Sequence, residues 1–199
     1  MTTPSEPHPV SHTVDAPGSR SRLGGVQTIG VAIAVPEPYG SELREYRASF
    51  GDPQADAVPT HVTLLPPTEV ERGQLVEVER HLARVASQHR SFCIHLRGTA
   101  TFRPVSPVVF VVVTEGISAC ELLASDIRRG HLARELTFPY HPHVTVAHHL
   151  DDSALDKAFD ALSDYDCTFD AMAFHLYVHG EDEVWRPYRA FELAASPVQ

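Results

Sequence analysis

The sequence predicts an α+β fold in which the second half of the chain resembles the first half in outline. Short apolar blocks typical of strands follow longer segments with apolar residues at helical spacing. Within each half, one strand-like segment contains a histidine followed two residues later by a threonine. These segments are THVTLLPP at residues 60–67 and HPHVTVAHH at residues 141–149. The repetition favours a coarse internal duplication.

The first half alternates strands and helices. We expect a buried strand at 26–36, a helix at 37–51 that stops at Gly51, a short strand at 57–67 and an amphipathic helix from Glu69 to Gln88. Pro66 and Pro67 should close the strand, because proline cannot continue a hydrogen-bonded ladder. Two paired strands follow, at 91–102 and 107–113, joined by a turn at 103–107.

The second half repeats this order and then adds a hairpin. A helix is expected from Ile117 to Leu136, followed by the strand at 141–149. Another helix should begin after Asp151 and Asp152, with Ser153 as its N-cap. The segments 168–178 and 183–194 are expected to form a hairpin across residues 179–182.

Length and composition indicate one domain. A chain of 199 residues fits one domain or two small lobes that share a core, and we place this domain at residues 25–195. Residues 1–24 mix Pro, Ser, Thr, His and Gly without periodicity, which predicts a disordered tail. The N-terminus lacks the layout of a signal peptide, and no apolar run approaches the roughly 20 residues of a membrane-spanning helix. We therefore expect a cytoplasmic protein without a membrane partner.

The charge of the chain limits its partners. Sixteen basic and 26 acidic residues give a formal net charge of −10. Such a chain is not expected to hold long duplex nucleic acid, which requires a basic surface. A small anionic ligand, or one RNA end, in a locally positive cleft remains compatible with this charge.

The two His-x-Thr segments place the same pair of side chains on one face of a strand. Alternate residues of a strand point to opposite faces, so His61 and Thr63 share a face while Val62 and Leu64 point into the core. His143 and Thr145 share a face in the same way. If the strands meet, two imidazoles could act as acid and base on a phosphodiester, and two hydroxyls could bind its free oxygens. This chemistry requires neither a metal nor a cofactor.

These segments resemble the signature of the 2H phosphoesterase superfamily, which includes bacterial 2′-5′ RNA ligases and cyclic nucleotide phosphodiesterases. HVTL at 61–64 and HVTV at 143–146 carry the resemblance, and GTATFRPVSPVVFVVV at 98–113 and EVWRPYRAFELA at 183–194 agree with it. The resemblance covers residues 26–194. It implies two pseudo-symmetric α+β lobes, with antiparallel sheets lining a central cleft and helices on the outside. It also implies that His61, Thr63, His143 and Thr145 are catalytic, with His143 as the base and His61 as the acid.

Six further residues are candidates for holding the rest of the substrate, because aromatic rings stack on bases and arginine binds phosphate. They are Phe102, Arg103, Tyr140, His141, Arg186 and Tyr188.

The expected function is a metal-independent phosphodiesterase that hydrolyses 2′,3′-cyclic phosphate or 2′-5′-linked nucleotide or RNA-end substrates. We expect it to act as a monomer without a cofactor. Three alternatives remain open. The same site run in reverse would be an RNA 2′-5′ ligase, and an intact cleft could serve a non-catalytic nucleotide- or RNA-end-binding module. His141, His148 and His149 could instead form a metal site.

Overall fold

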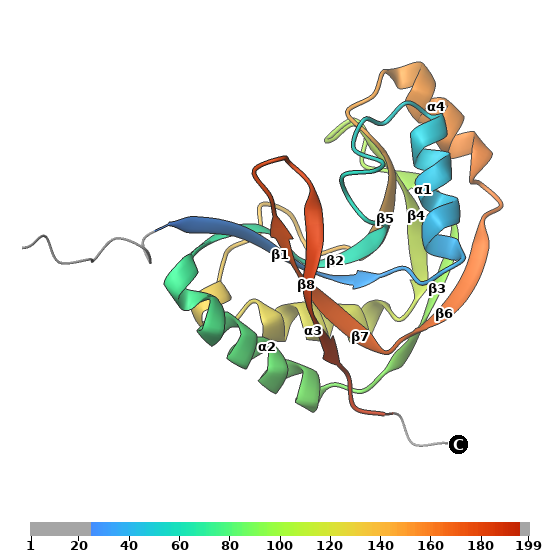
Figure 1. Cartoon of the computed structure of the whole chain (residues 1–199). Helices are drawn as coiled ribbons and strands as arrows, with labels where there is room; N and C mark the ends of the chain where they lie inside the picture. The colour runs from blue at the N-terminus through green and yellow to red at the C-terminus, as the bar shows by residue number, and fades with distance from the viewer. Residues whose placement is uncertain (1–24, 196–199) are drawn as a thin grey trace, which may run out of the picture.

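The computed structural model describes residues 25–195, which form two four-stranded antiparallel sheets (Figure 1). The first sheet has the order β2 (His61–Glu71), β1 (Val26–Ala34), β7 (Ala173–His179) and β8 (Trp185–Glu192). The second sheet has the order β5 (His143–His148), β4 (Val108–Glu115), β3 (Phe92–Thr101) and β6 (Asp166–Ala171). The predicted α+β fold of two lobes is confirmed.

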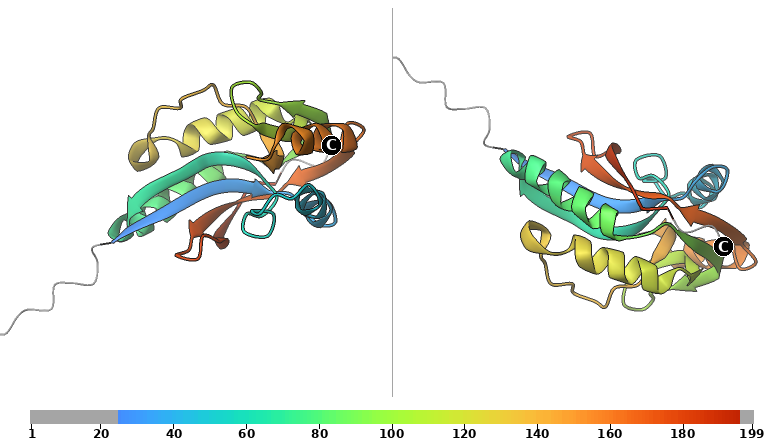
Figure 2. Two further views of the ribbon diagram at one scale, coloured as in Figure 1. Left: turned by 90° about the horizontal axis from the view of Figure 1, so that it is seen from above. Right: turned by 90° about the horizontal axis from the view of Figure 1, so that it is seen from below.

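Four helices and two single 3₁₀ turns pack against these sheets. They are α1 (Tyr39–Ser49), η1 (Arg72–Gln74), α2 (Leu75–Gln88), α3 (Ile117–Ile127), η2 (Gly130–Leu132) and α4 (Asp152–Ala161). Helix α4 covers the second sheet, while α2 lies beside α3 and against β8 (Figure 2). The other two helices cross between the lobes, because α1 contacts β5 and α3 contacts β2. The lobes are therefore interlocked.

The two His-x-Thr strands occupy equivalent places. Strands β2 and β5 are the edge strands of their sheets, and they contact each other. Each pairs with the preceding strand of the chain, to which a helix connects it. The two units are β1–α1–β2 and β4–α3–β5. The lobes nevertheless differ from the sequence halves, because the C-terminal strands β7 and β8 return to the first sheet beside β1.

Alternate burial in the two edge strands follows the predicted faces. Val62 and Leu64 in β2 are completely buried, as are Val144 and Val146 in β5. All four belong to one hydrophobic core that joins residues of both sheets. The histidines and threonines between them are only half-buried and lie on the opposite face.

The prediction that Pro66 and Pro67 end their strand is wrong, since β2 continues to Glu71. The ladder between β1 and β2 shifts register between Ile29 and Val31, and neither proline is paired there with a residue of β1. A bulge in an edge strand is a place where the missing N–H of proline costs little.

Two helix boundaries also differ from the prediction. Residues 69–71 extend β2 by pairing with β1, so the amphipathic helix α2 begins at Leu75 rather than Glu69. Helix α3 ends at Ile127 rather than Leu136. Gly130, with a positive φ of 60°, turns the chain into η2 shortly after that end.

Two further local predictions are corrected by tertiary structure. The segment 168–178 is divided at Met172 between β6 and β7, which belong to different sheets, so only β7 and β8 form the hairpin. The cap of α4 is Asp151, whose carboxylate accepts a hydrogen bond from the backbone of Ala154 at 2.8 Å. Ser153 lies inside the helix, and its hydroxyl donates to Asp151.

The predicted disordered tail, residues 1–24, lies outside the described residues. Within residues 25–195, every helix is too short or too polar to cross a bilayer.

Gly116 provides a test of how closely the β4–α3 turn approaches β3. Its φ is +88°, and a Cβ at this position would lie 2.5 Å from the carbonyl oxygen of Cys93. Both the backbone conformation and the contact disfavour a side chain. We expect Gly116→Ala to lower the free energy of unfolding by about 2 kcal/mol or more, measured by urea denaturation.

Gly73→Ala is the matched control, because a Cβ on Gly73 would have no atom within 4 Å and its φ is not positive. Its effect should stay within about 0.5 kcal/mol. Equal stability of the two variants would contradict the close approach.

Candidate active site

Residues of both His-x-Thr strands line one cavity of about 270 Å³. His61 and Thr63 reach it from β2, and Thr145 reaches it from β5. His143 lies on the same strand as Thr145, two residues before it and on the same face. It is close enough for the charge of His61 to lower its pKa. The structure therefore brings the four predicted catalytic residues to one region.

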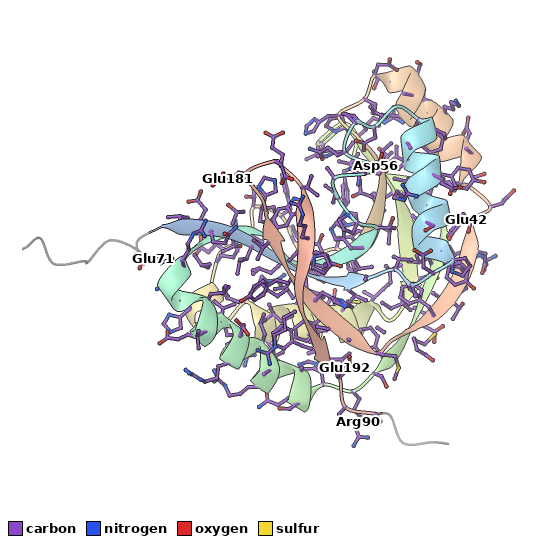
Figure 3. All side chains as sticks on the ribbon, viewed as in Figure 1. Glu42, Asp56, Glu71, Arg90, Glu181 and Glu192 are labelled. Carbon is purple, nitrogen blue, oxygen red and sulfur yellow. The ribbon has the colours of Figure 1, made fainter. Side chains whose placement is uncertain are left out.

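The side chains around this region come from elements that are distant in the sequence. The loop after α1 contributes Gln54, Val58 and Pro59 to the cavity wall. Figure 3 labels Asp56 in this loop and Glu181 at the tip of the β7–β8 hairpin, and both stand on the upper side of the molecule in that view. A backbone hydrogen bond of 2.9 Å from Trp185 to Ala57 joins the hairpin to the loop.

Each histidine is held by a hydrogen bond of the same kind. Nδ1 of His61 lies 2.6 Å from the carbonyl oxygen of Pro59, and Nδ1 of His143 lies 2.7 Å from that of His141. A carbonyl oxygen can only accept, so Nδ1 carries the proton in each ring. The lone pair of the neutral imidazole is then on Nε2. Each ring is fixed in orientation and offers one nitrogen for proton transfer.

Each threonine lies on the same face of its strand as the histidine. The hydroxyl of Thr63 lies 3.1 Å from Nε2 of His61 and donates to it when the ring is neutral. Thr145 is paired with Phe110 of β4 and lines the cavity. Two hydroxyls thus reach one cavity from opposite lobes, as the sequence predicts.

Burial lowers the pKa of His143 to about 4. Its ring packs against Phe102 and Phe110, with centroid distances of 5.0 and 4.9 Å. The hydrogen bond to the His141 carbonyl acts in the opposite direction, while the charges of His141 and His61 lower the pKa further. His143 is therefore a neutral base at neutral pH.

The pKa of His61 is also lowered, chiefly by burial and in part by the positive charge of Arg47. The hydrogen bond to Pro59 opposes this shift. A bound phosphate would place negative charge beside both rings and raise both pKa values.

Arg47, Gln54 and His148 also belong to the cavity wall. The sequence indicated neither Arg47 nor Gln54, and it suggested His148 only as a metal ligand. The guanidinium of Arg47 pairs with the buried carboxylate of Asp52 at 2.7 Å. Burial and the neighbouring His149 lower the pKa of His148. Arg47 lies in a predicted helix, but nothing in the periodicity of that helix distinguishes it from a surface arginine.

Trp185 and Tyr177 form an aromatic shelf in the same cavity, whose wall also includes Gly30. Tyr177 is paired with Gly30 across β7 and β1. A Cβ on Gly30 would lie 3.2 Å from the Trp185 ring, so the indole rests directly on the glycine backbone. The sequence identifies the tryptophan as part of the closing strand, but only the pairing of β7 with β1 places it in the cavity.

Three of the six predicted substrate-binding residues lie near the predicted catalytic positions. Phe102 and His141 pack with His143 in one aromatic cluster. Tyr140 is half-buried, and its hydroxyl donates to the carbonyl of Thr63 at 2.8 Å while Arg128 lies over its ring. Burial raises the pKa of Tyr140. The contacts of Tyr140 connect the segment before β5 to β2.

None of the six lines the cavity itself, and two of the other three are engaged in ion pairs. Arg103 pairs with Asp156 at 2.7 Å and with Asp152 at 3.5 Å, both in α4. Arg186 pairs with Asp182 at 2.6 Å across the turn of the hairpin. Tyr188 is 53% exposed. A role of these residues in substrate binding stays a prediction.

The histidine-rich strand β5 has the composition of a metal site but not its geometry. Among the described residues 25–195, no three His, Cys, Asp or Glu side chains are arranged to hold a metal ion. His148 lines the cavity and packs against His149, with ring centroids 3.8 Å apart, whereas His141 belongs to the aromatic cluster.

Comparison with known proteins agrees with the motifs. Residues 35–183 match the profile described as the 2′-5′ RNA ligase superfamily. A protein of Bacillus pumilus, provisionally named a phosphoesterase, is 30% identical over 171 residues, covering 82% of this chain and 96% of the relative. A relative from Bacillus cytotoxicus with the same provisional name is 28% identical over 144 residues, covering 71% of this chain and 83% of that protein.

The fold is similar to that of Escherichia coli LigT. The LigT complex with 3′-AMP has a TM-score of 0.60 and 21% identity, and it covers 85% of this chain and 99% of LigT. Other LigT structures contain NADP⁺ or ATP. At this identity the likeness concerns the fold.

The packing of aromatic rings around His143 leads to a testable prediction about the pKa of this histidine. Phe102→Ala would admit water to the ring, so the pKa of His143 should rise from about 4 toward the ordinary value of 6.5. An NMR titration of the His143 ring measures this midpoint directly. Phe138→Ala, which removes an exposed phenyl ring in the segment before β5, is the control and should leave the midpoint unchanged. An unchanged midpoint in the Phe102 variant would mean that the aromatic contact does not set the pKa.

Proposed function

The chain belongs to the 2′-5′ RNA ligase superfamily, and on this basis we propose that it is a phosphodiesterase that hydrolyses 2′,3′-cyclic phosphate or 2′-5′-linked nucleotide ends without a metal. The observation that carries the proposal is the matched pair of anchored imidazoles. Each comes from an edge strand, each has Nδ1 bonded to a backbone carbonyl two residues earlier, and each has a threonine on the same face.

The proposed reaction divides proton transfer between the two rings. Neutral His143 takes a proton from water as the water oxygen attacks phosphorus. Protonated His61 gives a proton to the sugar oxygen as its bond to phosphorus breaks. The products are a phosphomonoester and a free sugar hydroxyl. A proton then moves from His143 to His61 through solvent, which restores the starting state.

The threonines serve the phosphate oxygens in this mechanism. The hydroxyls of Thr63 and Thr145 donate hydrogen bonds to the two non-bridging oxygens, whose negative charge increases as phosphorus becomes five-coordinate. A substrate oxygen would replace His61 as the acceptor for the Thr63 hydroxyl. Nε2 of His61 is then free to carry its proton toward the leaving oxygen.

The dimensions of the cavity favour a single nucleotide or the end of an RNA chain. Its volume of about 270 Å³ is small for a ligand site, and the net charge of −10 disfavours long nucleic acid. The shelf of Trp185 and Tyr177 offers an aromatic surface on which a base can stack. The nucleotides present in LigT structures support the same class of ligand.

RNA 2′-5′ ligation is the second candidate, because the superfamily takes its name from that activity and a catalyst accelerates both directions of a reaction. The site would require the sugar hydroxyl as attacking group instead of water. Hydrolysis is favoured here because water is abundant and because an acidic chain is poorly suited to hold two RNA ends.

Replacement of either histidine tests the proposal. His61→Ala and His143→Ala should each reduce kcat by roughly 10²–10⁴-fold, since each removes one proton-transfer step. The assay follows hydrolysis of the four nucleoside 2′,3′-cyclic phosphates and a 2′-5′ dinucleotide in the presence of EDTA.

His131→Ala, on the exposed turn η2, is the matched control and should retain wild-type turnover. If both active-site variants hydrolyse substrate at the wild-type rate, the paired-histidine mechanism is refuted. Loss of wild-type activity in EDTA would instead point to a metal-dependent reaction.

The aromatic shelf makes a separate prediction about substrate binding. Trp185→Ala should raise KM by about 10-fold or more, because base stacking contributes roughly 1–3 kcal/mol per base. The effect on kcat should be smaller, since the indole lies away from the reacting phosphorus. Steady-state kinetics with a cyclic mononucleotide separates the two parameters.

Tyr188→Ala serves as the comparison, because Tyr188 is the exposed aromatic residue that the sequence alone favours for substrate binding. Because Tyr188 is outside the cavity wall, we expect its replacement to leave KM within about twofold, which is less than the loss of one hydrogen bond would cause. A larger effect for Tyr188 than for Trp185 would transfer the base-binding role to Tyr188.

A further inference from the structure

We propose that Arg47, together with Gln54 and His148, forms an anion-binding subsite in the same cavity that takes a second phosphate group of the substrate. The inference rests on the proposed function and narrows its substrate class. It points to a nucleotide with another phosphate on its 5′ side, either a terminal phosphomonoester or the phosphodiester that continues an RNA chain.

Arg47 is a buried charge with unused donors. Its side chain is only 7% exposed and lines the cavity. Nε donates to Asp52, but neither terminal nitrogen has a hydrogen-bond partner among residues 25–195. These nitrogens are not fully buried, so their donors are available to a ligand in the cavity that Arg47 lines. An anion in the cavity would supply acceptors in the forked geometry that arginine favours.

Asp52 fixes the position of this charge rather than filling the subsite. One of its oxygens accepts from Arg47 at 2.7 Å, and the other accepts from the backbone N–H of Gln54 at 2.9 Å. The carboxylate therefore ties the end of α1 to the loop that forms the cavity wall. The terminal guanidinium nitrogens remain available, and the side chains of Gln54 and His148 reach the same cavity.

The charged groups around the subsite act on two histidines of the cavity wall. Asp52 and Arg47 have opposite effects on the pKa of His148, whereas Arg47 is the one charged group among the causes that shift the pKa of His61. An anion bound there would lie next to the scissile phosphate, and the positive charge of Arg47 would offset the repulsion between the two phosphates.

The register of the first sheet separates this subsite from the aromatic shelf. His61 is opposite Ala34, Thr63 is opposite Ala32, and the Trp185 ring rests on Gly30. Four residues of a strand span about 13 Å, so the shelf and His61 stand at different positions along β1. Arg47 and His61 line the same cavity, and the charge of Arg47 acts on His61, so we assign Arg47 to the His61 end. A nucleotide with its base on the shelf and its reacting phosphate near Thr63 leaves the Arg47 end for a further phosphate.

Equilibrium binding tests the subsite without relying on catalysis. Adenosine 3′-monophosphate and adenosine 3′,5′-bisphosphate differ only by the 5′-phosphate. Calorimetric titration of the wild-type chain should give a Kd for the bisphosphate at least about 10-fold lower, as expected for a charge-assisted hydrogen-bonded pair. A dinucleotide that ends in a 3′-phosphate forms the other arm, and tighter binding of it than of the bisphosphate would identify a continuing phosphodiester as the natural group.

The double variant Arg47→Gln with Asp52→Asn removes the charge without leaving a carboxylate buried and unpaired. It should reduce the preference for the bisphosphate to about twofold or less, because the charge-assisted hydrogen bonds to the 5′-phosphate are lost. Arg47→Lys keeps the partner of Asp52 but loses the forked donors, and it should show an intermediate preference. This second variant keeps the test valid if the double variant does not fold.

Arg44→Gln with Asp56→Asn is the matched control. It removes an ion pair of the same 2.7 Å length from the same helix, but at an exposed position outside the cavity wall. The control should keep the wild-type preference. Equal Kd values of the two nucleotides in the wild type, or an unchanged preference in both Arg47 variants, would overturn the subsite. Failure of the wild type to bind the monophosphate would count against the proposed function itself.

Discussion

The contact between the edge strands β2 and β5 is the constraint on which the candidate site depends. Side chains of the second half hold the free edge of β2 through its carbonyl oxygens. Tyr140 donates to Thr63 at 2.8 Å, Arg128 to Leu64 at 3.2 Å and Arg134 to Pro67 at 2.9 Å. These bonds satisfy backbone acceptors that an edge strand otherwise exposes to another strand. They also fix β2 relative to the segment that leads into β5, so a single set of contacts protects the edge and sets the register between the two His-x-Thr motifs.

This arrangement determines how much freedom the catalytic groups retain. Each imidazole is held by its own strand, through a hydrogen bond to a carbonyl two residues earlier, while the strands are held by the core residues that alternate with the site residues. The orientation of each imidazole on its strand and the position of the two strands relative to each other therefore have different origins. The first can be read from the sequence because it requires only an extended strand. The second requires the interlocked packing of α1 on β5 and of α3 on β2.

The same division explains what sequence reasoning could recover. The alternation in HVTL and HVTV is sufficient to predict which side chains face away from the core, and the paired strands and final hairpin follow from local patterns. The course of β2 through Pro66 and Pro67 depends on a bulge opposite β1, which no local pattern encodes. Arg47 and Trp185 reach the cavity from α1 and β8, which lie outside both motifs. Their local sequence is that of an ordinary helix and an ordinary hairpin, so only the pairing of β7 with β1 and the packing of α1 reveal them.

The two motifs are alike in sequence but sit in unlike surroundings, and this difference assigns their roles in the proposed mechanism. His143 lies among Phe102, Phe110 and His141, and burial keeps its pKa at about 4. His61 is half-buried, and the charge of Arg47 adds to the lowering of its pKa by burial. Bound anions would neutralise the effect of Arg47, so the arrival of substrate removes one cause of the shift at His61. The aromatic walls around His143 are not altered in this way. Within the proposed mechanism, substrate binding would raise the pKa of His61 by removing this cause, in keeping with the proposed role of His61 as the acid and of His143 as the base.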